Sequence, residues 1–213
     1  MYLPSHFEEK RPEVLQQLMH DHPLGLLITQ GDSGLQANPI PFVFDADPAG
    51  GPGVLRAHVA RANPVWREAR TDTESMVVFQ GPQAYVSPGW YPSKVEHGKV
   101  VPTWNYCNVQ GRGLLRVIDD AGWVHAFITR LTHSHESTQA RPWAVSDAPA
   151  EYIATMQRAI VGIEITLTAL TGKWKTSQNR SAADREGVAR GLTQRSGSDA
   201  AEMAALVAGH GGA

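Results

Sequence analysis

Short runs of strand-forming residues, separated by turns, fill most of this 213-residue chain. They are rich in β-branched and aromatic residues and end at clusters of Gly, Pro, Asn and Asp, whereas helical periodicity appears mainly between or beyond them. Because strands do not alternate regularly with long helices, a doubly wound parallel sheet is not expected. The pattern predicts an α+β or mainly β domain, built as a β-barrel with peripheral helices.

The individual elements are predicted from the spacing of apolar residues and from the turn and capping residues at their ends. Apolar residues at helical spacing predict a helix over Pro12–His20, and further helices are expected after the Asp119–Asp120 cap, over 150–159, and from Ser181 onward. We expect strands over Leu24–Gln30, Leu35–Phe44, Val54–Ala60 and Glu74–Gln80, one long or two shorter strands over Val101–Ile118, and a strand pair over Ile160–Ser177.

Composition excludes several classes of protein. The net charge of −2 provides no global positive field, so any DNA contact would need a local basic patch. Cys107 is the only cysteine, so no disulfide can form within the chain, which fits a reducing cytoplasm. No signal-peptide pattern and no apolar run of membrane-spanning length is present. We therefore expect a cytoplasmic protein without membrane contact.

Aromatic rings are concentrated between Phe79 and Tyr106, together with Gly, Pro, Asn and Thr. An ordinary core strand would be dominated by Val, Ile and Leu. Rings beside hydrogen-bonding amides suit a planar heterocycle that is stacked and contacted at its edge. The alternative is an aromatic hairpin buried in a core or a subunit interface.

A candidate phosphate seat follows the strand that ends at Ala60. Asn63 is a favourable N-cap and Pro64 a favourable first helical residue, so free N–H groups would face Arg61. His58 has the same strand parity as Ala60 and faces the same side. The alternative is a capped helix beside a surface arginine.

Two further segments carry candidate ligand contacts. Pro39 and Pro41 remove two donors from one flank of their strand, which is therefore either a sheet edge or the wall of a slot. In the second segment, alternation places Thr103 and Asn105 on a polar face and Trp104 with Tyr106 on an aromatic one.

The only basic run is Lys173–Arg180, continued by Arg185, Arg190 and Arg195. Such a run contacts DNA or cofactor phosphates, or is simply a solvated helix face. A helix-turn-helix pattern is absent, and so are the dinucleotide, P-loop and G-x-S-x-G motifs. The histidines near residue 133 match no common metal-site spacing, so no metal is expected.

Taken in order, MYLPSHF, QANPIPF, HVARANPVW, VVFQGPQAYVSPGWY, VPTWNY and KTSQNR make the chain resemble the PaiB-type transcriptional regulators over nearly its full length. That family resembles the split-barrel FMN-binding proteins, which include pyridoxamine-phosphate oxidases. The resemblance implies an FMN-binding split β-barrel. With the boundary that the sequence gives near residue 178, we expect this domain over residues 1–178 and a helical extension over 179–213, which is part of the same domain or an appendage to it. The resemblance further implies a homodimer with flavin sites between the subunits, and negative regulation of protease and sporulation genes.

The resemblance also implies a site. The flavin phosphate would lie at His58, Arg61 and Asn63, and a strand of the partner subunit would close the pocket around Trp104 and Asn105. The ring would lie along five residues of two strands: Asn38, Pro39, Ile40, Val59 and Ala60. Two departures are evident. The segment ANPIPF lacks the Arg and Lys that oxidases carry there, and Thr176 replaces the leucine of the usual KLSQNR.

Three functions remain open at this stage. The first is a dimeric FMN-binding negative regulator, which contacts DNA directly or through a partner. The second is a flavin-dependent oxidoreductase acting on a small molecule, for which His58 is the best acid–base candidate, although no acid–base pair stands out. The third is a cofactor-free interaction protein whose aromatic segment only joins subunits.

Overall fold

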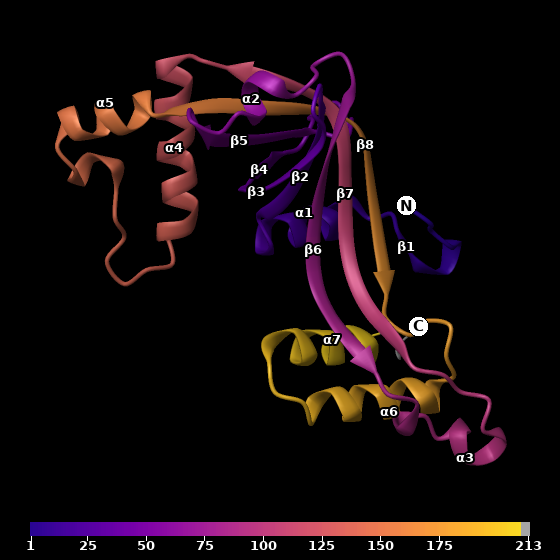
Figure 1. Cartoon of the computed structure of the whole chain (residues 1–213). Helices are drawn as coiled ribbons and strands as arrows, with labels where there is room; N and C mark the ends of the chain where they lie inside the picture. Colours follow the sequence, from indigo (N-terminus) through magenta and orange to yellow (C-terminus); the bar gives the residue numbers. More distant parts are fainter. Residues whose placement is uncertain (210–213) are drawn as a thin grey trace. The chain divides into compact units, whose positions relative to one another are not determined.

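The computed structural model describes residues 1–209. In that part of the chain, eight strands form one antiparallel sheet in the order β3-β2-β6-β7-β8-β5-β4, and β1 pairs with β8 (Figure 1). The strands are β1 Glu8–Glu9, β2 Leu24–Gly31, β3 Gly34–Pro41, β4 Val43–Asp45, β5 Val54–Ala60, β6 Glu74–Val86, β7 Thr103–Ile118 and β8 Ile160–Lys175.

Helices accompany the sheet. The α-helices are α1 Pro12–Asp21, α2 Val65–Glu68, α3 Ser93–His97, α4 Ala121–Glu136, α5 Ala150–Arg158, α6 Ala182–Thr193 and α7 Ser198–Gly209. Short 3-10 turns are η1 Ser5–Phe7, η2 Pro88–Trp90 and η3 Val145–Asp147. No helix within residues 1–209 is both long enough and apolar enough to span a membrane.

The described chain divides into two compact units, and β6, β7 and β8 contribute residues to both. Unit 1 comprises residues 1–18, 80–109 and 171–213, and unit 2 comprises 19–79 and 110–170. The predicted division into 1–178 and 179–213 stays a prediction.

In unit 2, β5 is a half-buried strand with two distinct faces. Leu55, Ala57 and Val59 are buried in the core, which explains their alternation with polar residues. The opposite face lies under α4, where Phe127 contacts His58 edge to face at 5.9 Å between ring centroids. Asp120 caps α4 by accepting a hydrogen bond from the Trp123 N–H at 2.7 Å, as the sequence predicted.

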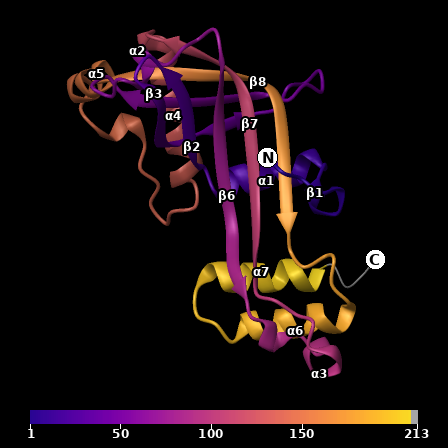
Figure 2. The same ribbon diagram turned by 45° about the vertical axis from the view of Figure 1, so that its right-hand side comes forward.

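In unit 1, α6 and α7 lie side by side (Figure 2). Their contact is made by buried small and apolar residues, among them Val188, Leu192, Met203 and Val207. Gly191 of α6 lies directly against Trp90. A Cβ added at this glycine would be only 2.3 Å from the indole ring, so no larger residue fits here. The Ala-rich tail is therefore packed helix, as predicted, and contributes to the core of unit 1.

Most predicted elements are confirmed, and β5 agrees residue for residue. The prolines do lie on a sheet edge: β3 pairs only with β2, with Pro39 opposite Leu26 and Pro41 opposite Leu24. Three strand predictions differ from the structure. The strand expected over Leu35–Phe44 is divided between β3 and β4, and the strand expected to end at Gln80 continues to Val86. The expected strand pair over Ile160–Ser177 is a single strand, β8, because Gly172 pairs with Glu9 of β1 and makes no turn.

Candidate functional site

The turn after β5 brings two of the predicted site segments together. Asn63 Nδ2 donates to Asn38 Oδ1 of β3 at 3.2 Å, and Asn63 Oδ1 accepts from the Val65 N–H at 3.0 Å. The asparagine thus contacts the first residue of the four-residue helix α2, but the N-cap of α2 is Pro64, one residue later than predicted. A polar pair links β3 to the turn at this point.

Arg61 is held by an ion pair in this turn. Its guanidinium donates to both carboxylate oxygens of Asp119, at 2.9 and 2.5 Å, and its Nε donates to the Arg158 carbonyl at 2.9 Å. Hydrogen bonding to Arg61 lowers the pKa of Asp119, and the same bond raises the pKa of Arg61. Because the pair is partly solvated, it is weak and exchangeable.

Arg67 is a second cation at the turn, and sequence reasoning missed it. Its guanidinium lies 4.6 Å from the centroid of the Trp66 ring, and it donates to the Arg61 carbonyl at 3.0 Å. Arg61 lies over the same ring at 5.7 Å. Within residues 1–209, Arg67 makes no ion pair, and Glu68 of the same helix instead accepts from Gln36 at 2.6 Å. The two arginines are six residues apart, and this spacing alone did not predict that they lie together. The turn between them brings both guanidinium groups to the Trp66 ring.

The predicted ring-lining residues differ in their exposure. Ile40 and Val59 are buried in the core, so their side chains are not available to a ligand at this surface. Pro39 and Ala60 are exposed, and Asn38 is half-buried. The surface at this end of β3 and β5 is therefore formed by a proline ring, a methyl group and an amide.

His58 lies beneath α4 in a largely apolar setting. Burial lowers the pKa of its imidazole, so the ring is neutral at pH 7. Its Nδ1 is buried and has no hydrogen-bond partner within the described residues. A neutral ring offers a phosphate at most one hydrogen bond and no charge.

The remaining predicted site residues lie in unit 1. The Trp104 ring is 55% exposed and meets Tyr85 edge to face at 6.1 Å between centroids. Asn105 is fully buried, and its Nδ2 donates to Ser177 Oγ at 2.9 Å, while its Oδ1 has no hydrogen-bond partner among residues 1–209. Ser177 adopts a φ of 67°, an uncommon left-handed conformation for a side-chain-bearing residue. Trp104 is thus presented outward, whereas Asn105 serves the packing of unit 1.

A charged network that the sequence did not reveal lies across β4, β5, β7, β8 and α4. Glu164 accepts from Arg56 and Arg116, and Asp45 pairs with Arg56 and Arg130. A hollow of about 180 Å³ lies beside it, lined by Arg56, Trp123, Ala126, Phe127 and Arg130. These partners are up to 108 residues apart, so no local pattern signals them.

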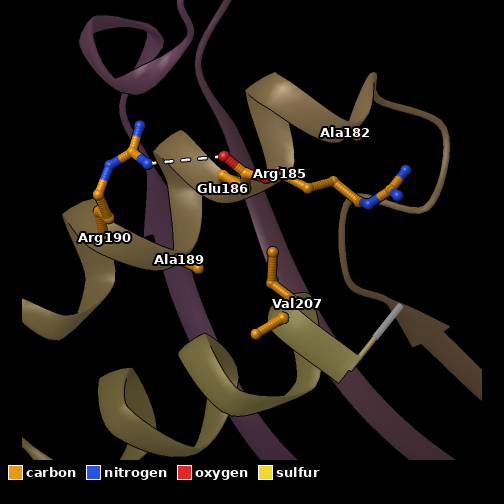
Figure 3. A pocket seen from close by; sticks show the side chains of 7 residues that line it. Ala182, Arg185, Glu186, Ala189, Arg190 and Val207 are labelled. Carbon is orange, nitrogen blue, oxygen red and sulfur yellow. Dashed lines mark ion pairs between the residues drawn. The ribbon is translucent and has the colours of Figure 1, made fainter. Parts of the chain in front are cut away.

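A larger hollow of about 410 Å³ lies between α6 and α7 (Figure 3). Arg190 forms an i, i+4 ion pair with Glu186 at its rim, and alanines and Val207 make up most of the remaining wall. This wall carries no aromatic ring that a planar ligand would stack on. No group of three or more metal-ligating side chains occurs in the described part of the chain.

Comparison with known proteins assigns the chain to a class. The model of the family described as "Putative FMN-binding domain" matches residues 1–169, so the chain belongs to this family. It is of the PaiB type and has the split-barrel fold, as the sequence motifs predicted.

Particular relatives agree with this assignment. An uncharacterized protein of Emericella nidulans is 38% identical over 97% of this chain and 96% of its own length. The protease synthase and sporulation protein PAI 2 of Bacillus subtilis is 26% identical over 97% of this chain and 96% of its own. The flavocytochrome Anf3 from Azotobacter vinelandii has the same fold, with a TM-score of 0.57 and 12% identity over 79% of this chain and 69% of that one.

The residues at the turn fit a phosphorylated flavin. The phosphate needs cations, which Arg61 and Arg67 supply at one indole, and the ring edge needs amides, which Asn38 and Asn63 supply. The partly solvated Asp119 is the one carboxylate that pairs with either arginine in the described chain. The family assignment supports FMN as the cofactor.

Proposed function

We propose that this chain is a homodimeric FMN-binding regulator of PaiB type. The observation that carries the proposal is the turn after β5, where two guanidiniums share the Trp66 ring beside the Asn38–Asn63 pair. In this proposal Arg61 and Arg67 bind the FMN phosphate, and the amides contact the polar edge of the ligand. Bound FMN would supply reversible electron transfer, so that the redox state of the flavin is coupled to gene control.

Trp104 and Tyr85 support the subunit contact. Both rings are exposed, and exposed aromatic residues are enriched in the cores of protein interfaces. A partner subunit covering Trp104 would close the flavin pocket, as in the family pattern. Replacing Trp104 with Ser would then shift the protein toward monomer in light scattering coupled to size exclusion, whereas the matched change Trp143→Ser would not. A wild-type protein that is monomeric at all accessible concentrations would contradict this part.

The flavin proposal is tested by comparing FMN with riboflavin, which lacks the phosphate. We expect wild-type protein to bind FMN more tightly, and Arg61→Ala to weaken FMN binding about tenfold or more through loss of a charged phosphate hydrogen bond. Riboflavin binding would change little. Arg70→Ala is the matched control, because Arg70 pairs with Asp72 outside the turn. An FMN titration curve unchanged by Arg61→Ala would overturn the phosphate seat.

Two assays separate the regulator from the alternative, a flavin-dependent oxidoreductase. Consumption of reduced nicotinamide in the presence of FMN would favour the enzyme. Binding to promoter DNA that weakens steeply with salt would favour the regulator, because phosphate contacts release counterions. His58 does not favour the enzyme, since its neutral ring is covered by α4.

A further inference from the structure

The basic run at the end of β8 is not a solvated helix face. Lys173 is 6% exposed and Trp174 is 7% exposed, and Thr176 and Ser177 are also buried. Strand alternation places Lys173 and Lys175 on one face of β8 and Trp174 on the other. Two ammonium groups are therefore held along one side of a strand inside unit 1.

Aromatic rings partly offset two of the three cations here. Lys173 Nζ donates to the Tyr2 carbonyl at 3.0 Å and lies 5.1 Å from the centroid of the Tyr106 ring. Arg180 lies 4.8 Å from the centroid of the Tyr91 ring. Cation–π contacts of this kind reduce the cost of burying a positive charge without neutralising it.

Lys175 has no such ring. Its Nζ donates to Thr103 Oγ1 and to the Trp104 carbonyl, so the ammonium group is fixed in position. Burial lowers the pKa of Lys175, and the positive charges of Lys173 and Arg180 lower it further.

No carboxylate within residues 1–209 forms an ion pair with any of these three cations. Glu8 lies opposite Lys173 in the β1–β8 register, but its carboxylate pairs with Lys10 at 3.2 Å, and Glu9 pairs with Arg11 at 2.6 Å. Partly buried cations without a counter-charge are costly, so the protein gains stability when an anion reaches them.

We propose that Lys175, together with Lys173 and Arg180, binds a phosphate group in unit 1. Three cations favour a multiply charged oxyanion over a carboxylate. Lys175 donates to the backbone carbonyl of Trp104, a residue whose side chain is exposed, so we infer a phosphate monoester of a planar ring as the ligand. None of the three cations belongs to the Arg61 turn, and all three lie beyond residues 1–169, which the family model covers.

The phosphate can belong to FMN or to another phosphorylated ligand, and the experiment separates the two. Inorganic phosphate is titrated calorimetrically into the full chain at pH 7 and constant ionic strength. We expect saturable binding that Lys175→Met weakens at least tenfold and Lys175→Arg changes about threefold or less. Lys94→Met is the matched control, because Lys94 is exposed on α3 of the same unit. If Lys175→Met fails to fold, Arg180→Gln is measured instead, and weaker phosphate binding is again expected.

The same variants are titrated with FMN and riboflavin. Loss of both inorganic phosphate and FMN binding, with riboflavin binding unchanged, assigns the site to the flavin phosphate, whereas loss of inorganic phosphate binding with unchanged FMN binding assigns it to a second ligand. The inorganic phosphate titration gives a result even if the chain binds no flavin. Failure of the proposed flavin function can therefore be distinguished from failure of the phosphate site. The site is overturned if the wild-type protein does not bind inorganic phosphate or if Lys175→Met binds it as tightly as wild type. It is also overturned if Lys175→Met weakens only the binding of single-stranded DNA.

Discussion

Arg61 and Asp119 form a two-point ion pair in which both carboxylate oxygens accept from one guanidinium. Asp119 is the residue just before the capping Asp120 of α4, so the pair joins the turn after β5 to the start of that helix. The geometry is the one by which arginine binds phosphate oxygens. In the proposed site, Asp119 would therefore compete with the phosphate for this guanidinium.

Removing this competing carboxylate should strengthen flavin binding. We expect Asp119→Asn to lower the FMN dissociation constant about two- to fivefold, the range that a solvated ion pair supports. Flavin fluorescence titration measures it, with riboflavin as the ligand that should not respond. Weaker FMN binding in Asp119→Asn would show that the carboxylate positions Arg61 for its ligand and does not compete with it.

Gly162 of β8 allows α4 to pack closely in unit 2. A Cβ at this position would lie 2.3 Å from Cζ3 of Trp123, which stacks on Phe127 at 5.1 Å. Gly162→Ala should therefore lower the free energy of unfolding by about 1–3 kcal/mol, the cost of overpacking a filled site. Urea denaturation measures the change, and Gly209→Ala, where no atom lies within 4 Å of the added Cβ, should be nearly neutral.

Ser177 combines a hydrogen bond with an unfavourable backbone conformation. Ser177→Ala leaves Asn105 Nδ2 buried without a partner and should cost about 1–3 kcal/mol. Ser177→Gly loses the same bond but relieves the positive φ, so it should be more stable than Ser177→Ala by about 1 kcal/mol. Equal stability of the two variants in urea would contradict the strained conformation.

His58 should contribute to acid sensitivity. Burial lowers its folded-state pKa below the ordinary value, so the unfolded chain binds the proton more readily. This contribution to stability is therefore intact above pH 6.5 and is lost as the pH falls through the folded-state pKa. Unfolding free energies measured between pH 7.5 and 5 should fall less steeply in His58→Phe than in wild type, as the eight other histidines are common to both. His135→Phe, an exposed position, should retain the wild-type slope.

Cys107 should be inert in the folded protein. Burial raises the pKa of its thiol to about 12, so almost no thiolate is present at pH 8. We expect a disulfide reagent such as DTNB to react only as fast as the chain unfolds, and stoichiometrically in denaturant. Rapid labelling without denaturant would show that this part of β7 opens locally.

Much of the fold could be predicted from the sequence, because the alternation of apolar and polar residues and the turn residues at strand ends are local signals. β5 shows this best, since its buried and polar residues alternate between clear ends at Val54 and Ala60. The predicted end of the next strand at Gln80 was too early. β6 continues to Val86 through Gly81, where a Cβ would approach Leu18 to 2.8 Å, so the glycine serves packing and does not mark a turn.

The site was less accessible to sequence reasoning. The motifs located the turn at Arg61 and Asn63, but they did not indicate that Asp119 binds the guanidinium or that Arg67 joins it. The basic run at Lys173–Arg180 resembled a solvated face, because only tertiary packing reveals that Lys173 is buried and that Lys175 and Arg180 are half-buried, with no ion-pair partner within residues 1–209. Pairings of this kind are set by the whole fold.

The two prolines of β3 have a consequence for the protein in a crowded solution. In the antiparallel pairing with β2, Pro39 and Pro41 leave the outer margin of the sheet without two of the amide donors that an incoming strand would need. Strand-by-strand growth into fibrils is therefore disfavoured along that margin, and a second copy that meets this margin would do so through side-chain surfaces.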